Sequence, residues 1–99
     1  MSYTVRFAPA AADDLQRLFR FLAERDVNAA KEARAAIATG IQMLESFPFS
    51  CRKVDTSNPF LRELVISFGS YGDVALFEIE APTTVTVLAV RHQREDDFH

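Results

Sequence analysis

Basic side chains that could act on a phosphodiester, or hold an acidic partner, lie in the second half of the chain. They are Arg52, Lys53, Arg62, Arg91, His92 and Arg94. Cleaving RNA requires a base for the 2′-hydroxyl, an acid for the leaving oxygen, and cations that stabilise the developing charge. In a nuclease the catalytic residues would be His92, Arg62 and Arg91, with His92 as the general base because its unperturbed pKa is near neutral.

Arg62 and His92 also have structural interpretations. Arg62 lies among apolar residues of a predicted strand, so it could point toward a phosphate or an acidic partner. It could equally form an ion pair within the chain, with Glu78, Glu80 or Asp96. His92 could bond to the backbone or to Asp96 instead of transferring a proton, and this structural role is the one we favour.

The charged residues at the C-terminal end argue against a nuclease. Arg91 and Arg94 could border a basic groove, but the acidic residues beside them would repel phosphate. These are Glu95, Asp96 and Asp97. The formal net charge of −3 points the same way, because proteins that bind nucleic acid usually carry an excess of Lys and Arg.

Other kinds of chemistry find little support in the composition. With two histidines, one cysteine and scattered acids, no spacing suggests a metal site, and three glycines give no phosphate-binding loop. We therefore expect no metal and no cofactor. The one cysteine, Cys51, is expected to be a small apolar residue of the interior rather than a nucleophile.

The first half of the chain predicts a strand and two helices. Residues 3–7 alternate between apolar and polar, which is typical of a half-buried strand. Pro9 is suited to the first helical position. An apolar stripe follows, formed by Leu15, Leu18, Phe19 and Leu22. Asn28 is the expected N-cap of a second helix, which runs from about residue 29 to 46 and ends before Pro48.

The second half predicts three strands after an irregular segment. Turn-forming residues mark 47–59 as irregular. The strands are expected at 60–68, 74–80 and 85–90, with turns at Gly69–Ser70 or Gly72–Asp73 and at 81–83. The last strand is almost continuously apolar, as expected of a central strand covered on both faces.

Together these elements predict one α+β domain over residues 1–99. The order is β-α-α-β-β-β, with a helical hairpin packed on a mostly antiparallel four-stranded sheet. No apolar run approaches membrane-spanning length and no leader-like segment opens the chain, so we expect a cytoplasmic protein without membrane contact.

Several short motifs, in order along nearly the whole chain, resemble the ParE/RelE toxin superfamily. The opening strand Tyr3-Thr4-Val5-Arg6-Phe7, the helix start Ala11-Ala12-Asp13-Asp14-Leu15 and the segment Leu44-Glu45-Ser46-Phe47-Pro48 match it. So do Arg52, the strand fragment Arg62-Glu63-Leu64 and the closing stretch Leu88 to Asp96, which contains His92, Arg94 and Asp96 in the pattern H-x-R-x-D.

The resemblance implies the toxin of a type II toxin–antitoxin system, which includes plasmid stabilisation proteins. ParE-like members inhibit DNA gyrase, and RelE-like members cut messenger RNA in the ribosome. The acidic charge favours the protein-directed, non-enzymatic branch. The ribosome-dependent endonuclease, and a non-toxic binding module of the same fold, remain alternatives.

The resemblance also implies a cognate antitoxin as partner, with a homodimer or a hetero-oligomer as possible assemblies. We expect the antitoxin to cover the helical hairpin and an edge strand. The expected antitoxin-binding residues are Leu18, Phe21, Leu22, Ile37 and Ile41. The expected target-binding residues are Arg52, Arg62, Arg91, His92 and Arg94.

Overall fold

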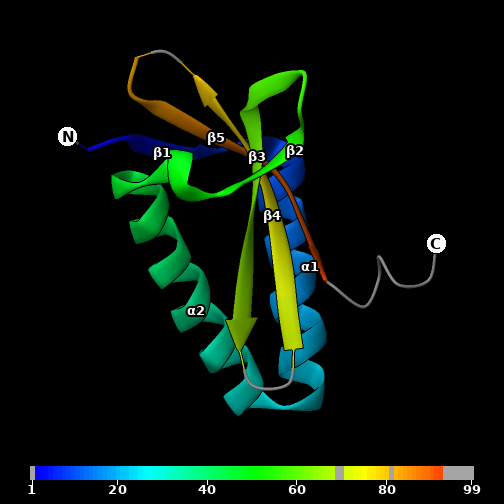
Figure 1. The fold of residues 1–99 in the computed structure, drawn as a ribbon. Coiled ribbons are helices and arrows are strands. Elements are labelled where there is room, and N and C mark those ends of the chain that lie inside the picture. The colour runs from blue at the N-terminus through cyan, green and yellow to red at the C-terminus, as the bar shows by residue number, and fades with distance from the viewer. Residues whose placement is uncertain (1, 69–70, 81, 93–99) are drawn as a thin grey trace.

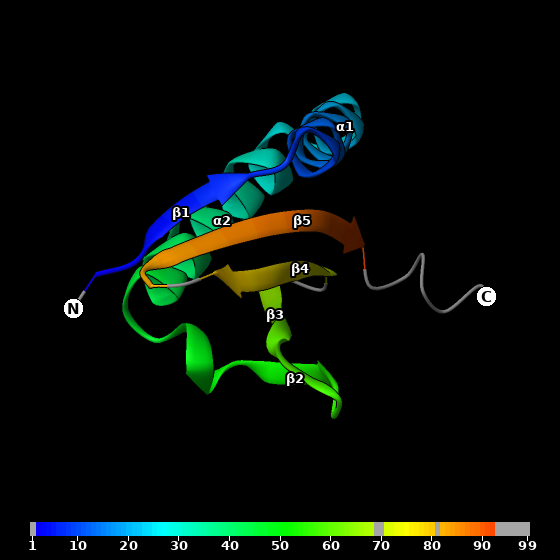
Figure 2. The same cartoon turned by 90° about the horizontal axis from the view of Figure 1, so that it is seen from above.

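The computed structural model describes the backbone of residues 2–68, 71–80 and 82–92. Its elements are β1 (Thr4–Phe7), α1 (Pro9–Arg25), α2 (Val27–Ser46), the 3-10 turn η1 (Pro48–Ser50), β2 (Arg52–Asp55), β3 (Asn58–Phe68), β4 (Tyr71–Glu80) and β5 (Thr84–His92). The strands form one sheet in the order β1-β5-β4-β3-β2. β1 runs parallel to β5, and the other neighbours are antiparallel. Both helices lie on one face of this curved sheet (Figures 1 and 2).

The α+β prediction with a helical hairpin is confirmed, but the sheet has five strands instead of four. The additional strand is β2, which falls in the segment predicted to be irregular. All four of its residues are exposed, so neither face of the strand required an apolar pattern that the sequence could reveal. The β3–β4 connection falls at residues 69–70, outside the described residues, while Gly72 and Asp73 belong to β4. The alternative turn at Gly72–Asp73 is therefore wrong.

A single residue, Asp26, separates the two helices. Its carboxylate accepts hydrogen bonds from the backbone N–H groups of Asn28 (2.9 Å) and Ala29 (3.4 Å). Asp26 is therefore the N-cap of α2, and the prediction that Asn28 fills this role is wrong. The cap satisfies N–H groups that have no partner in the first turn of a helix, and α2 starts immediately after it.

The core lies between the hairpin and the sheet. Phe77, Val85, Val87 and Leu44 are among its most completely buried side chains. Gly40 lets α2 approach β3 closely, because a Cβ at this position would lie 3.2 Å from side-chain atoms of Leu64 and Ile66. The two layers are therefore packed at close range.

β5 is an interior strand, as predicted, but a bulge interrupts it. The pairing with β4 shifts between Leu76 and Phe77. As a result Val87 pairs with Phe77 and Val90 pairs with Ala75, so that both valines, three residues apart, enter the same core. The apolar run of β5 is therefore continuous partly because the bulge changes which of its side chains face the core. Within the described residues, neither helix is long and apolar enough to cross a membrane.

Candidate functional site

Arg62 lies in β3, with only 8% of its surface exposed. Its guanidinium donates hydrogen bonds to three backbone carbonyls: Nε to Pro59 O (2.8 Å), and Nη1 to Phe49 O (2.8 Å) and to Cys51 O (2.9 Å). The guanidinium carbon also lies 5.2 Å from the centre of the Phe49 ring. Arg62 therefore joins the start of β3 to η1 and to the residue before β2.

This arrangement differs from both interpretations of Arg62 made from the sequence. The bonded groups are carbonyls of its own chain, whereas a phosphate or a carboxylate was expected. Glu78 faces the other side of the sheet, because Arg62 pairs with Phe77 while Leu61 pairs with Glu78. Glu80 binds Arg6, and Asp96 lies outside the described residues.

The C-terminal end of β5 holds two further candidates, Arg91 and His92. Arg91 is exposed and pairs with Val74, on the sheet face opposite to the core. The backbone of His92 pairs with that of Asp73, a carboxylate that is completely buried. The side chain of His92 and the whole of Arg94 lie outside the described residues.

Asp14 links α1 to this end of β5 by a hydrogen bond. Its Oδ2 accepts a hydrogen bond from the backbone N–H of Val90 (2.9 Å), and its Oδ1 accepts one from Arg17 (2.6 Å). The carboxylate reaches Val90 two residues beyond the bulge. Asp14 therefore supports the strand end that carries Arg91 and His92.

The backbones of Arg62 and His92 are not neighbours in the sheet. They lie two strands apart, because Arg62 aligns with Phe77 and Val87, whereas His92 aligns with Asp73 and Ile66. The offset between Arg62 and Ile66 is about 13 Å along the strand, at about 3.3 Å per residue, and two strand spacings add about 9 Å across the sheet.

Arg52, in β2, is exposed and paired. Its Nη2 lies 2.6 Å from Oε1 of Glu63, which is the residue directly opposite in β3. This pair lies on the sheet face away from the helices, since Arg62, the next residue of β3, points inward. Arg52 is thus accessible to a partner, although an exposed ion pair of this kind is easily exchanged for another.

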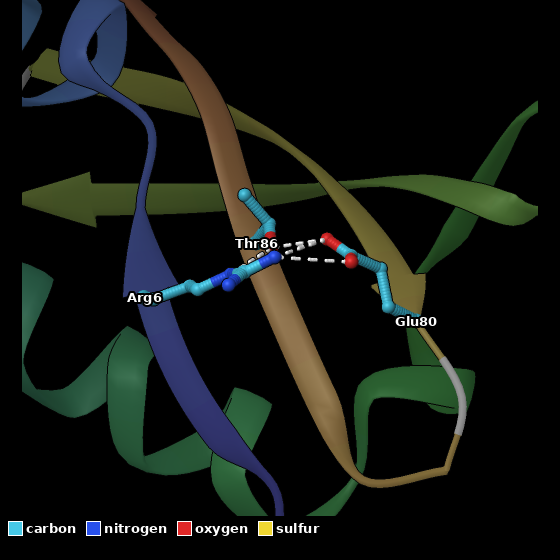
Figure 3. A network of polar contacts seen from close by, with 3 residues as sticks. All are labelled: Arg6, Glu80 and Thr86. Carbon is cyan, nitrogen blue, oxygen red and sulfur yellow. Dashed lines mark hydrogen bonds and ion pairs between the residues drawn. The ribbon is translucent and has the colours of Figure 1, made fainter.

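A polar network that the sequence did not reveal joins β1, β4 and β5 (Figure 3). Arg6 donates from Nε to Thr86 Oγ1 (2.9 Å) and from Nη2 to Glu80 (3.1 Å), and Thr86 donates to the same carboxylate. The hydrogen bond from Thr86 and then the charge of Arg6 lower the pKa of Glu80, although partial desolvation opposes them. Only the parallel pairing of β1 with β5, which places Arg6 beside Thr86, brings these residues together.

The expected antitoxin-binding residues divide into buried and accessible ones. Leu22 and Ile37 belong to the core, with 2% and 6% of their surface exposed, so they cannot contact a partner while the hairpin stays packed. Leu22 packs against Ala33 where the two helices meet, and Ile37 packs in the core between α2 and the sheet. Leu18 and Ile41 are half-buried, and Phe21 is exposed and covered on one side by Arg25, 3.8 Å from its ring centre.

Cys51 and the apolar space between α2 and β3 are parts of the interior. Cys51 is buried, and burial raises the pKa of its thiol more than the charge of Arg62 lowers it. The apolar space between α2 and β3 has a volume of only about 10 Å³, which is scarcely enough for one water molecule. No group of three or more His, Cys, Asp or Glu side chains suited to a metal ion occurs within the described ranges.

Comparisons with known proteins agree on the fold and the family. Residues 5–97 match the model of the ParE toxin of type II toxin–antitoxin systems, parDE. The structure is similar to one from the chromosomal ParDE system of P. aeruginosa, with a TM-score of 0.68, 14% identity, and coverage of 92% of this chain and 96% of that one. It is also similar to one from the RelBE2 toxin–antitoxin complex of Mycobacterium tuberculosis, with a TM-score of 0.62, 26% identity, and coverage of 94% and 100%.

No curated protein sequence matches this chain significantly. The family model nevertheless covers almost the whole chain, and the fold is similar to that of the two solved structures. The chain belongs to the ParE toxin family of type II toxin–antitoxin systems.

Proposed function

We propose that this toxin acts in the cytoplasm by binding DNA gyrase, without catalysing a reaction, and that a cognate antitoxin neutralises it. Membership of the ParE family supports a toxin whose partner is an antitoxin. Gyrase as the target follows from the resemblance to ParE-like toxins, and from the acidic charge of the chain, which is poorly suited to a ribosomal RNA target.

The burial and the hydrogen bonds of Arg62 are the main support for the non-enzymatic proposal. A nuclease would need this cation at a phosphate, but Arg62 is buried and its Nε and Nη1 donors bond to the carbonyls of Pro59, Phe49 and Cys51. Exposing it would break three hydrogen bonds in the interior. The remaining candidates for target binding are Arg52 and Arg91, both exposed, together with His92 and Arg94.

The exposed side of the hairpin is the proposed antitoxin surface. Phe21 is its accessible aromatic residue, and Leu18 and Ile41 are half-buried beside the packed core. An amphipathic segment that covers Phe21 would remove apolar surface from water, which is the dominant favourable contribution to such contacts.

A RelE-like endonuclease is the second candidate, because the chain is 26% identical to the chain from the RelBE2 toxin–antitoxin complex. The two proposals differ in the molecule that is attacked. The direct test is a supercoiling assay with purified toxin and the gyrase of the same organism, run beside ribosomes translating a defined message. We expect lost supercoiling and an intact message. Unimpaired supercoiling together with a cut message would reject the gyrase proposal in favour of the second candidate.

A further inference from the structure

The two helices cover only one face of the sheet (Figures 1 and 2). The other face, which we call the open face, is crossed at its middle by β4, the third strand in the order. Ala75 and Phe77 of β4 are buried in the core. Because side chains alternate between the two faces of a strand, Val74, Leu76 and Glu78 point to the open face.

Apolar side chains lie side by side along the middle of the open face. Val74 pairs with Val65 of β3, and Leu76 pairs with Ala89 of β5, so the members of each pair are direct cross-strand neighbours. We call these four residues the apolar strip. Val65 is 41% exposed and the other three are half-buried. Apolar residues that adjoin one another on a surface in this way are typical of an interaction site.

Opposite charges lie at the two ends of the apolar strip. Glu78, which is half-buried, follows Leu76 on the same face of β4, and the exposed Arg91 pairs with Val74. At about 3.3 Å per residue, Glu78 lies about 13 Å along β4 from Val74. Within the described ranges, no hydrogen bond or ion pair involves the side chain of Glu78 or of Arg91. The strip is therefore bounded by a carboxylate at one end and a guanidinium at the other.

Two other arginines of the open face are each paired with a carboxylate. Arg52 lies 2.6 Å from Glu63, and Arg6 lies 3.1 Å from Glu80. With Glu78, the face thus carries three carboxylates beside the apolar strip. Phosphate groups would be repelled by them, so the face is better suited to a protein than to a nucleic acid. Electrostatic complementarity across such an interface determines which partner fits and in which orientation.

We propose that the open face docks an amphipathic segment of the target protein, with apolar side chains on the apolar strip, a basic residue at Glu78 and an acidic residue at Arg91. The inference rests on the proposed function, in which the toxin acts by binding a protein, gyrase. Burial of the strip supplies the favourable free energy, and the order of the two charges fixes the direction in which the segment lies.

The supercoiling assay with purified toxin and gyrase of the same organism tests the proposal through an exchange of the two charges. Glu78→Arg combined with Arg91→Glu reverses their order and leaves the formal net charge of −3 unchanged. Each charge would then face a like charge on the target, so half-inhibition should require roughly tenfold more toxin or above. Val65→Lys places a charge in the apolar strip and should weaken inhibition in the same way.

Both changes have matched controls on the helices. Arg20→Glu combined with Glu24→Arg exchanges two exposed charges of α1, again without a change in net charge. Val27→Lys places a lysine at an exposed valine at the start of α2. Both controls should inhibit gyrase as strongly as the native toxin, and circular dichroism establishes that every variant is folded.

A folded exchange variant that inhibits as strongly as the native toxin would overturn the inference and leave the proposed function intact. An equal loss of inhibition in the control exchange on α1 would also overturn it. So would an exchange variant that keeps inhibition but no longer binds the antitoxin, because the open face would then belong to the antitoxin. A native toxin without effect on gyrase would reject the proposed function, and this inference with it.

Discussion

Arg62 illustrates how a charged residue can belong to the interior. A buried guanidinium is tolerated only where acceptors meet its N–H groups, and here three backbone carbonyls do so. These carbonyls come from η1, from the residue before β2 and from the residue that precedes Phe60. The side chain therefore replaces regular backbone pairing where the chain turns between α2 and β3, and its role is to stabilise this turn.

Replacing Arg62 should reduce stability more than it changes a target contact. In Arg62→Ala the three carbonyls lose a buried donor, so the free energy of unfolding should fall by about 2–4 kcal/mol. Urea denaturation measures this directly. Arg52→Ala, which removes an exposed ion pair, should cost less than about 1 kcal/mol. A fully stable Arg62→Ala protein that had lost its toxicity would contradict the structural role.

Glu80 provides a prediction on acid stability. Its pKa in the folded chain is lowered by Thr86 and Arg6. A carboxylate with a lowered pKa contributes stability above the pKa of the unfolded chain, about 4.3, and this contribution is lost as pH falls through the folded value. Glu80→Gln should therefore flatten the decline of stability below about pH 4.3. Unfolding at a series of pH values measures the slope.

Glu24→Gln is the matched control, because Glu24 is an exposed residue of α1 outside the network. If the free energy of unfolding fell with the same slope at acid pH in the native chain and in Glu80→Gln, the network would not contribute to stability.

The junction of α1 and α2 depends on its single connecting residue. Asp26→Ala removes the side-chain acceptor at the start of α2 and should destabilise the protein by about 1 kcal/mol. Asn28→Ala is the informative control, since Asn28 lies in the first turn and its side chain is not the cap. Thermal unfolding compares the two. A larger loss from Asn28→Ala than from Asp26→Ala would contradict the assignment of the cap.

The elements that could be predicted from the sequence are those with a periodic apolar face. The two helices and the strands at β3, β4 and β5 each bury such a face, and their predicted positions differ from the observed ones by only a few residues at the ends. β2 could not be predicted, because Arg52-Lys53-Val54-Asp55 is exposed on both faces and only its pairing with β3 makes it a strand.

The same limit applies to the candidate site. Basic side chains could be identified from residue type, but their burial could not. From the sequence, Arg62 could face a phosphate or an acidic partner, or pair with a carboxylate of its own chain. Its actual acceptors are backbone carbonyls, which leave no trace in a sequence. The Arg6, Thr86 and Glu80 network required the parallel pairing of β1 and β5, a contact between residues 80 positions apart.

Taken as a whole molecule, the toxin separates its surfaces by element. The hairpin presents Phe21 on one face of the sheet, the end of β5 presents Arg91, and β2 is an exposed strand at the end of the sheet. A small domain of this kind buries a limited share of its surface and leaves apolar groups for partners. This separation suits a protein that acts by binding.

Induction of the toxin alone, with DNA synthesis and protein synthesis followed in parallel by labelled precursors, tests the central claim most directly. A protein that binds gyrase should stop DNA synthesis first while translation continues, and co-expression of the antitoxin should prevent this. Immediate arrest of translation with cleaved messages, while DNA synthesis continues, would contradict the account.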